Sequence, residues 1–436
     1  MNAVNIGLIG LGTVGSGTIS VLKRNAEEIS RRAGREIHIL IAAVRDVSRS
    51  RDADTSDIIL TDNIDEVVNH PDVQVVVELA GGDGPILDAV NTALDNGKHV
   101  VTANKALIAI HGNEIFQKAQ DNGLMVAFES AVAGGIPIIK SIREGLSANR
   151  IEWVAGIING TSNFILTRMS EGGESFSDVL ADAQRLGYAE ADPAFDIEGV
   201  DAAHKLTILA SLAFGIPLQF DAVYVEGITE ITGEDIAYAR ELGYRIKHLG
   251  IARMTPSGVE LRVHPTLIPE QRLIANVNGV MNAVLVNADA VGPTLYYGAG
   301  AGAEPTASAV VADLVDVVRT ITSDPHNRVP HLAFQPDSLG DYRILPIDEV
   351  ETAFYLRLSV VNRPGVMASI ATIFGKRNIS IQSVIQKGSG IPEDDVTIIM
   401  LVQKTLEGSM VEAIREVENL DHVNGSVVRI RLEELD

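Results

Sequence analysis

The segment VNIGLIGLGTVG, residues 4–15, joins a run of apolar and β-branched residues to three glycines with the spacing GxGxxG. Residues 5–9 have the composition of a buried strand, and an amphipathic helix is predicted after the glycines. Glycines at this spacing allow a tight turn, let a pyrophosphate reach helix N-terminal amides, and let the helix pack on the strand. The motif alone would also fit a simple turn, but its context favours a dinucleotide site made by Gly10, Leu11, Gly12, Thr13, Val14 and Gly15.

The first 130 residues alternate short strand-like runs with helical ones. Strands are predicted at residues 5–9, 37–44, 73–79, 99–101 and 124–128, with helices beginning near Asp62 and Pro85. This alternation is typical of α/β proteins with a Rossmann-type, doubly wound parallel sheet. We expect residues 1–130 to form an NAD(P)-binding domain that is completed by a helix near residues 305–322.

Beyond the first domain the pattern changes twice. Residues 131–320 mix strands, helices and glycine-rich turns, as in an α+β domain, and the proline-containing residues 321–352 suit a linker. Residues 353–436 then predict a βαββαβ unit of the ferredoxin-like type. Its strands are expected at 354–360, 379–386, 396–402 and 426–432, its helices at 366–377 and 410–420, and a glycine-containing turn after residue 386.

Composition excludes several classes of function. The 436 residues include 35 basic and 58 acidic ones, a net charge of -23, so no nucleic-acid partner is expected. With no cysteine, disulfides, thiolate metal sites and cysteine nucleophiles are excluded. No basic stretch precedes the first apolar run, and the apolar residues 206–218 are too few to span a bilayer, so we expect a cytoplasmic protein without a membrane partner.

The choice of cofactor depends on the end of the second predicted strand. Arg45 stands there, followed by Asp46. An arginine can pair with the extra phosphate of NADP, whereas an acidic residue would bind the ribose hydroxyl of NAD. Because Arg45 comes first we favour NADP(H), and NAD(H) stays open, as does a surface role for the arginine.

The richest chemistry lies in residues 183–205. If Gly199 opens a helix, Asp201 and Lys205 lie four residues apart on one face, where the carboxylate can orient the ammonium. Four more acids, Glu190, Asp192, Asp196 and Glu198, precede them in a loop. A surface ion pair or a cation site would also fit these residues, but beside a dinucleotide domain we favour acids that hold a substrate ammonium and a lysine that transfers a proton.

Two further residues have both a functional and a structural interpretation. Lys105 follows a strand end, at the edge where open sheets bind ligands, and it could equally be a surface lysine at a helix N-terminus. His204 points about 100° away from Lys205 around the helix, so we expect it to be structural.

Residues 183–205 resemble the signature of homoserine dehydrogenases, and residues 101–105, 156–167 and 298–309 are similar to that family too. The resemblance covers essentially the whole chain and is to monofunctional members with a C-terminal ACT domain. It implies reversible, NAD(P)H-dependent reduction of L-aspartate 4-semialdehyde to L-homoserine, in the biosynthesis of threonine, methionine and isoleucine. It also implies that residues 131–320 bind substrate and form a homodimer or homotetramer.

The resemblance further implies roles for single residues. Lys205 would donate the proton, Lys105 would lie between cofactor and substrate, and Glu190, Asp196 and Asp201 would bind the substrate. Thr102, Asn104, Gly187 and Gly302 would line the cofactor. Residues 129–136, which by themselves predict only a turn, resemble the family's loop for a monovalent cation, Na⁺ or K⁺, with ligands from Glu129, Val132, Gly134 and Ile136.

The C-terminal unit resembles ACT domains, in which a small amino acid binds near the turn after the first strand, here residues 362–365. Family members that carry it are commonly inhibited by threonine, and the alternative is a purely structural dimerisation module. An aspartate-semialdehyde dehydrogenase is excluded because its acyl-enzyme forms on a cysteine. An NAD(P)-binding amino-acid sensor without catalysis is the other alternative, and the Asp201 and Lys205 pair disfavours it.

Overall fold

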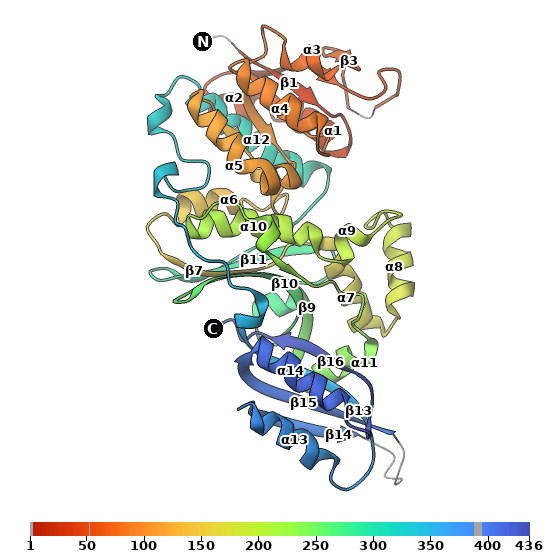
Figure 1. Ribbon diagram of the computed structural model, residues 1–436. Helices are drawn as coiled ribbons and strands as arrows, with labels where there is room; N and C mark the ends of the chain where they lie inside the picture. The colour runs from red at the N-terminus through yellow and green to blue at the C-terminus, as the bar shows by residue number, and fades with distance from the viewer. Residues whose placement is uncertain (1–2, 52, 388–394) are drawn as a thin grey trace. The chain divides into compact units, whose positions relative to one another are not determined.

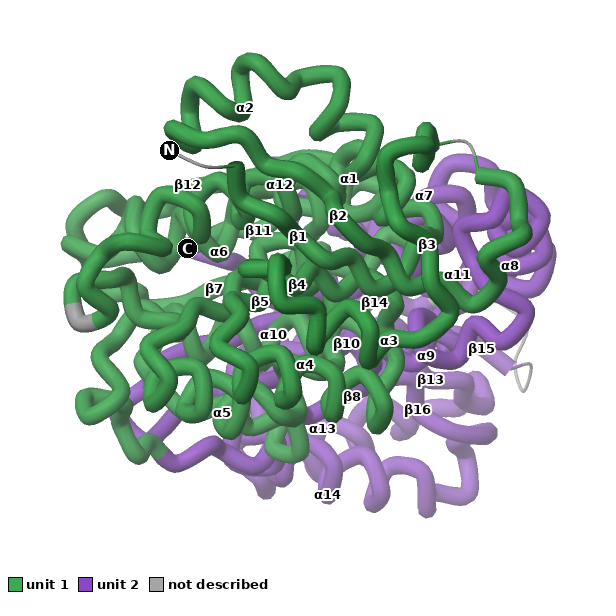
Figure 2. Tube along the Cα trace, turned by 90° about the horizontal axis from the view of Figure 1, so that it is seen from above, with its two compact units in different colours: residues 1–160, 201–223, 280–342 green, residues 161–200, 224–279, 343–436 purple. Residues whose placement is uncertain are grey.

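The computed structural model describes residues 3–51, 53–387 and 395–436 of the chain (Figure 1). The chain forms two compact units, each assembled from three separate stretches of sequence (Figure 2). Unit 1 comprises residues 1–160, 201–223 and 280–342, and unit 2 comprises residues 161–200, 224–279 and 343–436. Among the described residues, no helix is long and apolar enough to cross a membrane.

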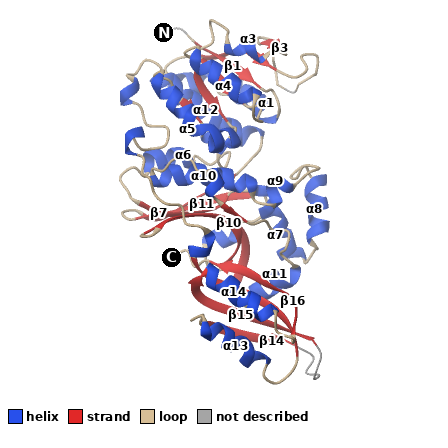
Figure 3. Ribbon diagram, viewed as in Figure 1, coloured by secondary structure: helices blue, strands red, loops and turns tan. Residues whose placement is uncertain are grey.

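Unit 1 contains a six-stranded parallel sheet (Figure 3). Its strands are β1 (Val4–Ile9), β2 (Ile37–Ala43), β3 (Ile59–Thr61), β4 (Val75–Glu78), β5 (His99–Thr102) and β6 (Val126–Ala127). Their order across the sheet is β3-β2-β1-β4-β5-β6, with every neighbouring pair parallel. This order reverses at β1 and β4, as in doubly wound dinucleotide-binding domains. The predicted Rossmann-type fold is confirmed.

Two strands differ from the sequence-based prediction. The three-residue strand β3 was not predicted, because so short a segment shows no periodicity. The strand predicted at residues 124–128 contains only Val126–Ala127. The amide of Leu124 still donates to the carbonyl of Ala119 in the preceding helix, and the carbonyl of Phe128 already accepts from Ala131 in the next turn. The first residue of the predicted strand is therefore hydrogen-bonded to the preceding helix, and its last residue to the turn that follows.

Six helices accompany this sheet: α1 (Thr13–Arg24), α2 (Ala26–Ala33), α3 (Ile64–Val68), α4 (Pro85–Asp95), α5 (Lys105–Asp121) and α12 (Ala303–Thr320). The helix expected near residues 305–322 is α12, which packs against α1. The contact is close, because a Cβ on Gly17 would lie 2.5 Å from the carbonyl oxygen of Ala303. Val310 and Leu314 of α12 are fully buried in one core with Ile6 and Leu8 of β1. A late segment thus shares a hydrophobic core with the first strand of the chain.

The rest of unit 1 surrounds a long buried helix, α10 (Val200–Phe214). The other elements are α6 (Ile138–Lys140), β7 (Ile151–Ile157), β11 (Met281–Ala288), β12 (Gly292–Ala299) and the short helical segments Glu129–Ala131, Ser141–Gly145, Phe220–Ala222, Pro325–Asn327 and Pro336–Ser338. Strand β11 pairs with β7 on one side and with β12 on the other, both antiparallel. Every residue of α10 from Asp201 to Phe214 is buried, so a charged side chain on this helix requires partners.

Unit 2 begins with α7 (Gly160–Gly172), α8 (Phe176–Arg185) and α9 (Ala194–Ile197). It continues with β8 (Tyr224–Val225), α11 (Gly233–Glu241), β9 (Tyr244–Thr255), β10 (Gly258–Pro269) and a short helix, Leu273–Asn276. Strands β9 and β10 form a long antiparallel hairpin, and β8 pairs parallel to β10. Together they form the mixed-sheet part that the α+β pattern predicts.

The end of the chain forms the predicted βαββαβ unit. After a short helix, Ile347–Glu349, its elements are β13 (Glu351–Val361), α13 (Val366–Lys376), β14 (Ile381–Lys387), β15 (Asp395–Leu406), α14 (Glu407–Glu418) and β16 (Val423–Leu432). The strand order β16-β13-β15-β14 is antiparallel, and β16 also pairs parallel to β10. The ferredoxin-like fold is confirmed, whereas the expected turn after residue 386 lies outside the described residues.

A fully buried arginine anchors the last strand. Arg431 of β16 is 0% exposed, and its guanidinium donates to Glu407 at 2.6 Å and to Glu226 at 2.8 Å. Burying a charge is tolerated only when opposite charges and hydrogen bonds replace water. These contacts tie the C-terminal strand to α14 and to the residue that follows β8.

Candidate active site

The glycine motif forms the turn between β1 and α1. Gly10 has a φ of +96°, and a Cβ there would lie 2.7 Å from the backbone nitrogen of Ala80. A Cβ on Gly15 would lie 2.3 Å from the Gly10 oxygen, whereas one on Gly12 would meet no protein atom within 4 Å. Packing therefore requires the first and third glycines but not the second. Gly12 is the N-cap of α1 and supplies no side-chain cap, so the space beside the helix amides fits a phosphate group.

A buried carboxylate that the sequence analysis missed organises the next two loops. Glu78, at the end of β4, accepts hydrogen bonds from the amides of Ala80 and Gly81 at 2.9 and 2.8 Å and from the hydroxyl of Thr102 at 2.6 Å. Burial raises the pKa of Glu78. Asn104 donates to the carbonyl of Gly82 at 2.7 Å and caps α5. The side chains of Thr102 and Asn104 thus hold the loops that precede Lys105.

Lys105, Asp201 and Lys205 come together in unit 1. Lys205 donates to one carboxylate oxygen of Asp201 at 2.7 Å, as the four-residue spacing on α10 predicts. The ammonium of Lys105 lies 3.1 Å from the other oxygen. Lys205 also donates to the carbonyl of Ile158 at 2.7 Å, and the side-chain amide of Asn159 donates to the carboxylate of Asp201 at 2.8 Å. One carboxylate therefore bridges two ammonium groups.

The electrostatics of this cluster favour its charged form. Burial by itself would raise the pKa of Asp201, but the charges of Lys205 and Lys105 outweigh it and hold the pKa well below its ordinary value. The Lys205 side chain is 11% exposed and that of Lys105 is 34% exposed. A partly accessible ammonium that is oriented by an ionised acid can donate a proton to an oxygen that develops negative charge.

The acidic loop before α10 belongs to unit 2. The carboxylate of Asp196 accepts from the hydroxyl of Thr161 at 3.1 Å, and its carbonyl accepts from Ser162 at 3.0 Å. Glu190 is exposed, and Gln184 donates to its carbonyl at 3.1 Å. Gly187 has a φ of +77° directly after α8, the conformation in which many helices end, so chain geometry alone accounts for this glycine.

The remaining expected cofactor residues lie at ends of elements in unit 1. Arg45 follows β2 and is exposed. The neighbouring carboxylate of Asp46 accepts from the amide and the hydroxyl of Ser48 at 2.8 and 2.6 Å, which holds its pKa below the ordinary value. Gly302 is the N-cap of α12, with a φ of +123°. These contacts occupy Asp46 with its own turn.

The expected cation loop is a strained turn in unit 1. Ala133 and Gly134 both have positive φ, +53° and +46°, and a Cβ on Gly134 would lie 2.5 Å from the Gly300 oxygen. The carboxylate of Glu129 accepts from the amides of Ile139 and Lys140 at 2.9 and 2.8 Å. The side chain of Glu129 is therefore engaged by this turn, and the carbonyls of Glu129 and Ile136 accept hydrogen bonds from the amides of Val132 and Ile138. Among the described residues, no group of three acidic or histidine side chains could hold a metal ion.

Two other expected residues have simple surroundings. The ring of His204 stacks on Phe220 with the centroids 4.2 Å apart, and burial lowers its pKa to about 4. This position agrees with a structural histidine.

In the C-terminal unit, Gly365 has a φ of +93° and caps α13, while Gln386 donates to Asn362 at 3.5 Å.

Tertiary packing supplies the residues that the sequence analysis missed. Ile158 contributes a carbonyl and Asn159 a side-chain amide to the lysine cluster from just after β7. Both lie in the family-like residues 156–167, but nothing in that segment marked them as partners of the lysines. Glu78 did have a signal, because it is a charged residue at the end of an apolar strand on the ligand-binding edge.

Comparisons with known proteins cover the whole chain. Residues 10–129 match the family model for the homoserine dehydrogenase NAD binding domain, residues 137–315 that for homoserine dehydrogenase, and residues 354–419 that for the ACT domain. A homoserine dehydrogenase from Pseudomonas aeruginosa is 62% identical over 436 residues, with 100% of each chain covered. The crystal structure of one from Thiobacillus denitrificans is 63% identical, with a TM-score of 0.96 over 100% of this chain and 99% of that one. A hyperthermophilic archaeal homoserine dehydrogenase in complex with NADPH is 26% identical, with a TM-score of 0.61 over 72% of this chain and 97% of that one.

Proposed function

This chain belongs to the homoserine dehydrogenase family, and on that basis we propose that it reduces L-aspartate 4-semialdehyde reversibly to L-homoserine with NAD(P)H. It is an NAD(P)-dependent oxidoreductase with an ACT domain. The observation that carries the chemistry is the pair of lysines bridged by buried Asp201. The product would feed the biosynthesis of threonine, methionine and isoleucine.

Lys205 acts as the proton donor in this proposal. When bound, the nicotinamide supplies the hydride for the aldehyde carbon. Lys205 then gives a proton to the aldehyde oxygen, where negative charge develops, and Asp201 orients the ammonium through the 2.7 Å hydrogen bond. Lys105, also held by Asp201, would lie between cofactor and substrate when both are bound. Asn159 and the carbonyl of Ile158 keep this arrangement fixed.

The substrate's amino group requires acids. We assign Glu190, Asp196 and Asp201 to bind or orient it, a role supported by the family resemblance and by carboxylate chemistry. Gly10, Leu11, Gly12, Thr13, Val14, Gly15, Thr102, Asn104, Gly187 and Gly302 complete the proposed cofactor side, which the open space beside Gly12 supports.

We propose NADP(H) as the preferred cofactor, with NAD(H) as the alternative. The exposed Arg45 can pair with a ribose phosphate, whereas one oxygen of the Asp46 carboxylate is already engaged by Ser48. The NADPH complex of the archaeal relative supports the same choice for the family.

Five further assignments belong to the proposal. Carbonyl oxygens of Glu129, Val132, Gly134 and Ile136 would hold Na⁺ or K⁺, which a turn with positive φ at Ala133 and Gly134 supports. Residues 1–130, 131–320, 321–352 and 353–436 would be the nucleotide, substrate, linker and ACT regions. Threonine would inhibit through the ACT domain near residues 362–365. The enzyme would work in the cytoplasm as a homodimer or homotetramer.

An assay of NADPH oxidation on addition of L-aspartate 4-semialdehyde tests the reaction. We expect turnover that is reversed by L-homoserine with NADP⁺ and lowered by threonine. Cofactor binding without turnover would instead favour the amino-acid sensor, and an unchanged rate with threonine would remove the regulatory role.

Arg45→Ala tests the cofactor preference. We expect the ratio of kcat/KM for NADPH over NADH to fall about tenfold, because one charge-assisted contact to phosphate is lost. Arg49→Ala, also after β2 and exposed, is the matched control. An unchanged ratio in Arg45→Ala would remove this role.

A further inference from the structure

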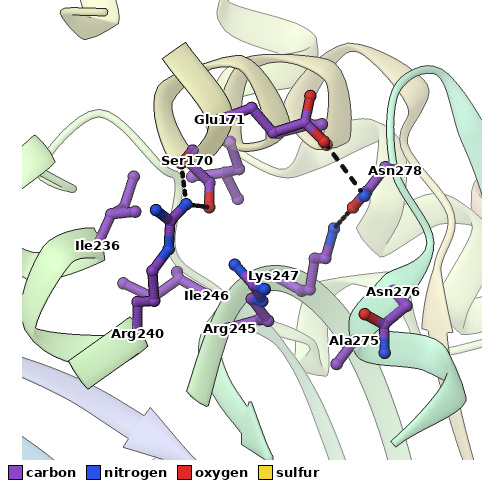
Figure 4. Close-up of a pocket in the computed structure, with 12 residues that line it drawn as sticks. Ser170, Glu171, Ile236, Arg240, Arg245, Ile246, Lys247, Ala275, Asn276 and Asn278 are labelled. Carbon is purple, nitrogen blue, oxygen red and sulfur yellow. Dashed lines mark hydrogen bonds between the residues drawn. The ribbon is translucent and has the colours of Figure 1, made fainter. Parts of the chain in front are cut away.

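A cavity of about 440 Å³ lies within unit 2, outside the residues assigned to the reaction (Figure 4). Its walls come from α7, from α11, from the start of β9, and from the Leu273–Asn276 helix together with Asn278 just after it. Small-molecule sites in proteins commonly have volumes of about 300 to 1,000 Å³. The cavity is therefore large enough for a small metabolite.

Three cations line this cavity. Arg240 comes from α11, and Arg245 and Lys247 come from β9, where their side chains lie on the same face because they are two residues apart. The close-up shows Arg240 and Lys247 on opposite sides of the cavity, with Arg245 between them. The carboxylate of Glu171 is the acidic group among the lining residues. Three cations and one acid leave the walls with an excess of positive charge.

The cations are held mainly by neutral oxygens. Arg240 donates to the carbonyl and the hydroxyl of Ser170. Lys247 donates to the carbonyl of Val277 at 2.6 Å and to the side-chain oxygens of Asn278 at 2.9 Å and Asn163 at 3.3 Å. The guanidinium of Arg245 lies 3.9 Å from Glu270. These bonds orient the positive groups while leaving most of their charge uncompensated.

Lys247 has the greatest need for an anion. It is 3% exposed, and within the described part of the chain no carboxylate forms an ion pair with it. Burial and the charge of Arg245 lower its pKa to about 8, although the charge of Glu171 opposes the shift. Taking an ammonium out of water is costly unless an opposite charge accompanies it. A bound anion would supply that charge.

We propose that this cavity binds a small metabolite through its carboxylate or phosphate group, at a site separate from the lysines that carry the reaction. Arg240 and Arg245 present planar donor pairs that match the oxygens of such groups, and the ammonium of Lys247 adds a further positive charge. Leu166, Ile236, Ile246 and Ala275 supply an apolar wall for the aliphatic part of the ligand.

Isothermal titration of the full chain with inorganic phosphate and with succinate tests the site. The buffer is chloride at constant ionic strength, and saturating NADPH is present to fill the nucleotide site. We expect one equivalent of phosphate, of succinate, or of each to bind. The anion that binds with higher affinity shows whether the site prefers a phosphate or a carboxylate group. If neither binds, the proposal is wrong.

Variants locate that binding in the cavity. Arg240→Gln and Arg245→Gln change side chains that are exposed or partly exposed, and each should weaken binding about tenfold, the loss of one charge-assisted contact. Arg343→Gln removes an exposed arginine elsewhere in unit 2 and should bind as wild type does. Wild-type affinity in the Arg240→Gln, Arg245→Gln double variant would place the anion elsewhere and overturn the proposal.

A pH titration gives a second readout that needs no variant. Succinate keeps its charge above pH 7, whereas Lys247, whose pKa is lowered to about 8, loses its proton between pH 7 and pH 9. The other charged groups that line the cavity are Arg240, Arg245 and Glu171. Affinity should therefore fall severalfold between pH 7 and pH 9. A constant affinity over this range would contradict a bound anion beside Lys247.

Discussion

Two buried lysines, Lys205 in unit 1 and Lys247 in unit 2, are held in opposite ways. Lys205 donates to the ionised Asp201 at 2.7 Å, so its charge is balanced inside the protein. Lys247 donates to three neutral oxygens and no carboxylate of the described residues forms an ion pair with it. The difference teaches that hydrogen bonds can position an ammonium without neutralising it. The first lysine is equipped to transfer a proton and the second to attract an anion.

The largest expected effect follows from removing Lys205, the proposed proton donor. Lys205→Met keeps the length of the side chain but not the ammonium, so kcat for aldehyde reduction should fall about a thousandfold, within the range for general acids. NADPH affinity, measured by fluorescence titration, should stay near wild type, because the glycine turn is untouched.

The control for this variant is another lysine of the same unit. Lys118→Met removes an ammonium that pairs with Asp95 on the protein surface at 2.8 Å, and kcat should be unchanged. If Lys205→Met kept wild-type kcat, Lys205 would not be the proton donor, and the two buried lysines would not differ in catalytic role.

A smaller effect is expected from the acid that bridges the lysines. Asp201→Asn preserves the shape but leaves two ammonium groups unbalanced, so kcat should fall about a hundredfold and the free energy of unfolding by about 3 kcal/mol. Kinetics and urea unfolding measure the two losses. Asp95→Asn, from an exposed pair, should cost less than about 1 kcal/mol, and equal losses in both variants would contradict the importance of burial.

The smallest effect concerns the unpaired charge of Lys247. Its pKa is about 8 in the folded protein and has an ordinary value of 10.5. Between these values the unfolded chain binds more protons than the folded one, so stability rises with pH. From pH 8 to pH 10 the wild type should gain about 2 kcal/mol relative to Lys247→Met.

Urea unfolding at several pH values, in buffers without phosphate, measures this gain. Lys404→Met, an exposed lysine of β15, should follow the wild type at every pH. If the difference in the free energy of unfolding between the wild type and Lys247→Met were the same at every pH, Lys247 would have its ordinary pKa. It would then not behave as a buried charge without a counter-ion.

Local patterns made much of this molecule predictable. The glycine turn, the strands β1, β2, β4 and β5 of the parallel sheet and the βαββαβ order depend on neighbouring residues, so periodicity and turn residues indicate them. The individual strands within residues 131–320 were not predicted. The pair of Asp201 and Lys205 was predictable for the same reason, because helix geometry places residues four apart on one face.

Contacts between distant segments were not predictable in this way. The bond from Asn159 to Asp201 spans 42 positions, and that from Lys247 to Asn163 spans 84. Nothing in the residues around Ser170 or Arg240 indicates that they line one cavity, since α7 and α11 meet only after the chain has folded. Similarly, the three residues of β3 acquire their strand conformation from β2.

The placement of β16 joins two parts of unit 2. This strand pairs with both β10 and β13, and Arg431 on it contacts both Glu407 and Glu226. Without β16, the edges of β10 and β13 that it covers would be unpaired, and the two acids would lose this cation. Unit 2 can therefore complete its native sheet only when residues 423–432 are in place, and a chain in which β16 is detached would expose strand edges prone to aggregation.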